Sequence, residues 1–160
     1  MPSVTQENFE MWNLSNVPTN ECTCEKCVEC CERRPCWGTP GDIELLIEKG
    51  FSHQLMLDYW VRTESEGGDI YILCPAIVDY EGRGAPFTPI GRCTFLVNKR
   101  CLIHKYKPIE GKYVCECDEH DNHLLYRHLR NLIVNEWDTR KGKEIIEKWK
   151  DIMGMSKGMW

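Results

Sequence analysis

The chain has 160 residues, a net charge of −5 and 42% hydrophobic residues, which suits a single domain with a hydrophobic core. The acidic balance lacks the basic footprint of a nucleic-acid-binding protein, and no apolar run approaches the roughly 18 residues of a membrane span. Residues 1–12 lack the basic start and apolar run of a secretory signal. We therefore expect a cytoplasmic protein with neither a nucleic-acid nor a membrane partner; the sequence specifies no protein partner.

The chain contains eleven cysteines, and in a reducing compartment such dense cysteines are more often metal ligands than disulfides. Many of them gather in residues 22–36, CTCEKCVECCERRPC, the first cysteine cluster. Within this segment the spacing C-x2-C-x2-C-C aims successive sulfurs at one centre. Thiolates at this spacing suit zinc or an iron–sulfur cluster.

In chain order, we expect residues 1–20 to form an N-terminal arm and residues 21–160 to form the metal-binding domain. Thr39 is a suitable helix cap, with Pro40 at the first helical position and Asp42 completing a capping box. The first helix is predicted over Ile43–Lys49, before Gly50. A second helix is predicted from Ser52 to about Val61.

A turn over Glu64–Gly68 should lead into a strand at Asp69–Cys74, rich in β-branched and aromatic residues. The three glycines and two prolines of Ala76–Gly91 predict an irregular loop. Cys93–Val97 and Cys101–His104 then resemble a small hairpin that turns at residues 98–100. Its pairing would bring Cys93 close to Cys101.

Residues 119–153 are predicted to form two C-terminal helices. The first runs from about Glu119 to Asn135. Asp138 or Thr139 caps the second, which runs to about Met153 with an amphipathic stripe through Trp149. The predicted fold is a small α+β domain of about four helices and a short β-hairpin or small sheet, stapled by a cysteine-ligated metal centre.

The sequence leaves the metal open. Zinc needs four ligands, and the clustered cysteines exceed that number. The C-x2-C-x2-C core is similar to ferredoxin-type loops, so an iron–sulfur cluster is preferred to a zinc ion. One zinc with spare thiols, or two separate metals, are the alternatives. Cys74 is predicted to be a buried structural thiol, and the tryptophans at positions 60, 137 and 149 are predicted to lie in the core.

Three pieces of the chain together resemble the CxxCxxCC cysteine-cluster family (YkgJ type) of zinc- or iron-chelating domains. They are Cys24-x2-Cys27-x2-Cys30-Cys31, the helix start at residues 39–43, and the block from Gly91-Arg-Cys93 to Arg100-Cys101-Leu-Ile-His104. Lys107-Pro108 and Cys115 are similar to the closing element of that family. The resemblance implies a metal centre with these candidate ligands: Cys24, Cys27, Cys30, Cys31, Cys93, Cys101 and Cys115. Cys36, Cys117 and His120 are additional candidates.

The family resemblance and the cysteine spacing together predict a metal-binding protein whose centre is structural or senses redox state or metal. The first alternative is an iron–sulfur enzyme that acts on a protein or small molecule, because a distant branch of the family includes flagellin lysine N-methylases. Such an enzyme needs a pocket beside the cluster, for which the Gly82–Gly91 loop is the candidate lining. A protein-interaction module that uses the Trp149 helix or the C-terminal tail is a further alternative.

Overall fold

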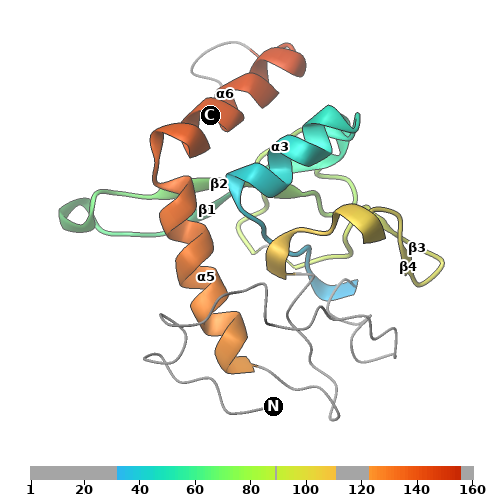
Figure 1. The fold of residues 1–160 in the computed structure, drawn as a ribbon, viewed down its shortest axis with the longest axis horizontal. Helices are drawn as coiled ribbons and strands as arrows, with labels where there is room; N and C mark the ends of the chain where they lie inside the picture. Colours follow the sequence, from blue (N-terminus) through green and yellow to red (C-terminus); the bar gives the residue numbers. More distant parts are fainter. Residues whose placement is uncertain (1–31, 89, 111–122, 156–160) are drawn as a thin grey trace.

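The computed structural model describes residues 32–88, 90–110 and 123–155, arranged as Figure 1 shows. The α-helices are α3 (Pro40–Glu48), α5 (His123–Trp137) and α6 (Arg140–Ile152). The strands are β1 (Leu55–Trp60), β2 (Ile70–Pro75), β3 (Leu96–Val97) and β4 (Arg100–Cys101), and the 3-10 turns are η2 (Ser52–Gln54), η3 (Glu64–Glu66) and η4 (His104–Tyr106). β1 pairs with β2 and β3 with β4, both antiparallel. These elements confirm a small α+β fold.

Helix α3 begins as its sequence predicts. The Thr39 side chain accepts the Asp42 N–H, and the Asp42 carboxylate accepts the Thr39 N–H in return, which completes a capping box. The apolar face of α3, made of Ile43, Leu46 and Ile47, is buried. The helix ends just before Gly50, whose φ of +90° favours glycine.

The predicted second helix is wrong, because only η2 is helical there and the chain then forms strand β1. Residues 55–58 are all buried, and a short apolar run with no exposed face gives no period that separates helix from strand. The pairing partner decides the structure. β2 supplies a full antiparallel register from Leu55↔Pro75 to Trp60↔Ile70, which pairs one edge of each strand, and the Gly82–Ala85 segment bonds the other edge of β1.

The turn and strand predicted after this segment are confirmed. Thr63 caps η3 in a second capping box, and Gly67 closes it with a φ of +107°. β2 follows from Ile70 to Pro75. The loop between β1 and β2 projects past α5 at the left of Figure 1. Trp60, near this end of the hairpin, is 37% exposed, so its predicted place in the core is wrong.

The described part of residues 76–91 forms an irregular loop, as predicted, with isolated bridges at Leu57↔Gly84 and Ile77↔Cys93. The hairpin that follows is shorter than predicted. It pairs only Leu96 with Cys101 and Val97 with Arg100. Its turn is made by Asn98 and Lys99, with φ values of 50° and 61°, as a two-residue hairpin turn requires.

The C-terminal helices close the domain over β2. Helix α5 ends at Trp137, two residues beyond the prediction; its predicted start, at residues 119–122, lies outside the described residues. Thr139 caps α6 by accepting the Gly142 N–H. Trp137 and Trp149 are fully buried, and their indole N–H groups donate to the carbonyl oxygens of Gly38 (2.7 Å) and Ser52 (2.8 Å). The predicted burial of these two tryptophans is confirmed.

Helices α3, α5 and α6 all contact β2, and α3 and α6 also contact each other. The core therefore lies between these three helices and the β1–β2 hairpin (Figure 1). Within the described residues, no helix is both long enough and apolar enough to cross a membrane. The predicted arm, residues 1–20, lies outside the described residues.

Candidate metal centre

Three of the predicted metal ligands, Cys36, Cys93 and Cys101, belong to the described residues. The others lie outside them: Cys24, Cys27, Cys30, Cys31, Cys115, Cys117 and His120. Among residues 32–88, 90–110 and 123–155, no three His, Cys, Asp or Glu side chains are grouped so that they could hold a metal ion. The metal staple of the predicted fold therefore stays a prediction. The structure describes the residues next to the proposed ligands, in segments 32–38, 91–94 and 108–110.

The segment that leaves the first cysteine cluster, residues 32–38, is hydrogen bonded to two other parts of the chain. Gly91, which precedes Cys93 by two residues, donates its N–H to the carbonyl oxygen of Arg33. The Glu110 N–H donates to the carbonyl oxygen of Trp37 at 3.1 Å. Segment 32–38 is thus tied both to the segment that carries Cys93 and to the segment that leads to Cys115.

Close packing supports these backbone bonds. A Cβ atom on Gly38 would lie 2.6 Å from the Pro108 side chain, so glycine is needed for the two segments to approach this closely. The Asp42 carboxylate also accepts the Ile109 N–H at 2.9 Å. Residues 108–110 are therefore held against both segment 32–38 and the start of α3.

Cys93 is buried, at 5% exposure, in a bridge to Ile77. The neighbouring bonds Thr94 N–H to Ala76 O and Val78 N–H to Arg92 O extend this bridge. The hairpin itself pairs Cys101 with Leu96, and Cys93 lies outside the paired residues, in the separate bridge to the segment after β2. The closeness of Cys93 to Cys101 stays a prediction.

Cys101 ends the hairpin in β4 and is partly buried. Its sulfur accepts a hydrogen bond from the Ile103 backbone N–H, and Lys107 is close enough to favour the thiolate. Burial nevertheless dominates and raises the pKa of the Cys101 thiol. An N–H donor and a nearby cation both favour the thiolate form of a cysteine, so the surroundings of Cys101 fit a ligand whose proton is displaced by metal.

Cys74 is fully buried in β2, which confirms the predicted burial of this thiol. Burial raises its pKa well above the ordinary value of 9.0, and the charges of Asp58 and Cys93 act in the same direction. A thiol that is so hard to ionise is a poor nucleophile. Cys74 therefore behaves as a core residue that happens to lie near Cys93.

A buried polar network, which sequence reasoning missed, lies beside segment 32–38. Asp58 is 6% exposed and Glu110 is 4% exposed. The Arg130 guanidinium contacts both Glu110 oxygens, at 2.7 and 3.1 Å, and lies 3.8 Å from the centre of the Trp37 ring. The Trp37 indole N–H donates to Asp58 at 3.2 Å. Asp58 could have been noticed as a charged residue inside an apolar run, whereas nothing in the sequence marks Arg130.

The two Asp58 oxygens accept the Trp37 indole N–H and the Tyr59 N–H. Burial still raises the pKa of Asp58, against the opposing effects of these donors, Arg130 and Arg34. The charge balance of this network is therefore set by desolvation as much as by pairing.

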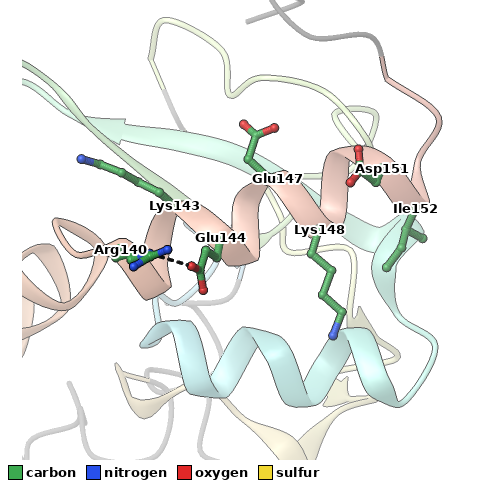
Figure 2. A pocket seen from close by; sticks show the side chains of 7 residues that line it. All are labelled: Arg140, Lys143, Glu144, Glu147, Lys148, Asp151 and Ile152. Atoms are coloured by element: carbon green, nitrogen blue, oxygen red, sulfur yellow. Dashed lines mark hydrogen bonds and ion pairs between the residues drawn. The ribbon is translucent and has the colours of Figure 1, made fainter.

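Two surface hollows offer no comparable site. The first lies on α6 and is lined by seven side chains of that helix alone (Figure 2), where Arg140 pairs with Glu144 at 3.1 Å. One helix cannot enclose a ligand, so this is a solvated face. The second, of about 210 Å³, lies between the β1–β2 hairpin and the α5–α6 junction. Neither is lined by residues 82–91, the loop predicted to border an enzyme pocket.

Comparisons with known proteins identify no relative. No family model, no curated protein and no solved structure matches the chain. The resemblance to the CxxCxxCC family stays a prediction that rests on the motifs at residues 24–31, 39–43 and 91–104.

Proposed function

We propose that this protein binds metal through a cysteine-ligated centre, with an iron–sulfur cluster preferred to zinc. One observation carries the proposal: segment 32–38 is hydrogen bonded on one side to Gly91 and on the other to Glu110. Those three segments are the ones that lead to the first cysteine cluster, to Cys93 and to Cys115. Hydrogen bonds thus hold together three segments, each of which is close in sequence to proposed cysteine ligands.

Chain length makes this convergence useful. Cys31 precedes Trp37 by six residues, and Cys115 follows Glu110 by five. An extended chain spans at most about 3.3–3.6 Å per residue, so the chain length limits the distance of either cysteine Cα from the Trp37–Glu110 pair to roughly 22 Å. Thiols from distant parts of the sequence can therefore reach one centre, as a tetrahedral zinc site or a cluster requires.

The residues present fit such a centre in chemistry. Cys101 has an N–H donor at its sulfur, and hydrogen bonds of this kind tune iron–sulfur clusters and orient zinc thiolates. The proposed ligands come from Cys24, Cys27, Cys30 or Cys31, Cys93, Cys101 and Cys115. Once bound, the metal would supply a link between the first cysteine cluster and the later cysteines Cys93, Cys101 and Cys115 and, if it is a cluster, a site for one electron. The proposed role is structural or sensory.

Metal content of cysteine variants tests the proposal. Cys27→Ser, Cys93→Ser and Cys101→Ser should each lower the metal per chain after purification without oxygen, because each removes a ligand. Cys74→Ala is the matched control, since Cys74 is also a cysteine of the described core but is not a proposed ligand, and it should retain the wild-type metal content. The proposal is wrong if the three serine variants all keep the wild-type metal content, or if Cys74→Ala loses metal to the same extent as they do.

A further inference from the structure

The buried charged network beside segment 32–38 carries an inference that rests on the proposed function. Asp58 and Glu110 are two carboxylates almost without solvent contact. A buried ion pair of this kind usually adds little to stability compared with an apolar replacement, because desolvation offsets the attraction. Its presence here calls for another role.

The contacts of this network join Trp37, the residue after Cys36, both to Glu110 and to strand β1. The Trp37 N–H donates to Glu110 at 3.3 Å, and the Trp37 indole donates to Asp58. Arg130, from α5, adds a bidentate contact to Glu110 and stacks on the Trp37 ring. One side chain thus touches both Trp37, which follows Cys36, and Glu110, which precedes Cys115 by five residues.

We propose that Arg130 is a positioning residue that clamps Trp37 to Glu110. The clamp holds the end of the first cysteine cluster and the segment that leads to Cys115 at the separation that the metal centre requires. Arginine suits this task because its planar guanidinium can bind a carboxylate through two N–H groups while its face stacks on an indole. Lysine has one ammonium point charge and cannot make both contacts at once. The identity of the side chain, beyond its charge, is therefore decisive.

The test compares metal release with folding in full-length protein. Arg130→Lys keeps the charge and loses the geometry. Arg130→Met combined with Glu110→Gln removes both charges, so that no carboxylate is left buried without its partner. Arg62→Met is the control, because Arg62 is also largely buried and also joins two parts of the chain. Among the described residues, its side chain bonds Asp138 at 3.4 Å and the Gly68 carbonyl at 2.8 Å.

Metal content, the rate of metal transfer to a chelator, far-ultraviolet circular dichroism and the melting temperature are measured for each protein. Both Arg130 variants should keep the wild-type dichroism spectrum and release metal at least about 10-fold faster, the usual scale for groups that orient ligands. Arg62→Met should release metal at the wild-type rate, whatever its melting temperature.

Each other outcome is decisive. Folded Arg130 variants that release metal at the wild-type rate would overturn the clamp and leave the proposed function standing. Unfolding of Arg130→Lys itself would also overturn it, because Arg130 would then support the whole fold and not the centre. Wild-type protein that carries no metal would overturn the proposed function, and the clamp with it.

Discussion

Trp37 and Glu110 are 73 residues apart in the chain, yet each donates a backbone N–H to the other. The Glu110 N–H donates to the Trp37 carbonyl at 3.1 Å, and the Trp37 N–H donates to the Glu110 carboxylate at 3.3 Å. This reciprocal pair joins the end of residues 22–36 to the segment that leads to Cys115. The account of the metal centre depends on this junction.

Asp42 is predicted to matter more than its capping role requires. Its Oδ2 atom accepts N–H groups from both Thr39 and Ile109, so it links α3 to the segment that contains Glu110. Thr39→Ala should lower the free energy of unfolding by about 1 kcal/mol, as for loss of an N-cap. Asp42→Ala should cost roughly 2–3 kcal/mol, because the Ile109 N–H also loses its acceptor. Urea unfolding of both variants measures the difference, and equal losses would show that the Ile109 bond contributes nothing.

Two glycines should respond in opposite ways to alanine. A Cβ atom at Gly142 would lie 2.5 Å from the Trp137 carbonyl oxygen, whereas at Gly41 the nearest atom is 3.7 Å away. Gly142→Ala should therefore destabilise the α5–α6 junction by about 1–3 kcal/mol. Gly41→Ala, in the first turn of α3, should be neutral or stabilise by up to about 1 kcal/mol. Melting temperatures that shift in the same direction would contradict this packing.

The helix ends of this fold could be predicted because their signals are local. Thr39 and Asp42, three positions apart in the chain, form a capping box, and the Thr139 side chain caps α6. The stripe that buries Trp149 is equally local, since it follows from the helical period. These elements need no knowledge of the rest of the chain.

Strand β1 and the polar network could not be predicted because tertiary contacts decide them. The spacing of Leu55, Met56 and Tyr59 fits a helix as well as a strand, and only pairing with β2 selects the strand. Arg130 lies on a helix whose pattern marks Leu129 and Ile133, but its partners Trp37 and Glu110 come from distant segments. The cysteine spacing predicts ligands, yet the bridge between Cys93 and Ile77 depends on how the loop after β2 folds back.

Asp58 should make the protein less stable as pH rises through the acid range. Burial raises its pKa in the folded state above the ordinary 3.8, so between these two pKa values the folded protein holds a proton that the unfolded chain releases. Unfolding then releases a proton, and raising the pH favours unfolding. The free-energy difference between wild type and Asp58→Asn, from urea unfolding at several pH values, should shift against wild type from about pH 3.8 upward and then level. A difference that is constant, or that shifts toward wild type, would contradict a raised pKa.

The most direct test of the metal centre is an absorbance spectrum and an elemental analysis of one wild-type sample purified without oxygen. The account predicts bound metal in stoichiometric amount, with about four irons per chain and a broad band near roughly 400 nm for the preferred iron–sulfur cluster. A colourless protein with one zinc per chain would support the cysteine-ligated centre and show that its metal is zinc instead of iron. Protein that is folded and carries neither iron nor zinc would contradict the central claim.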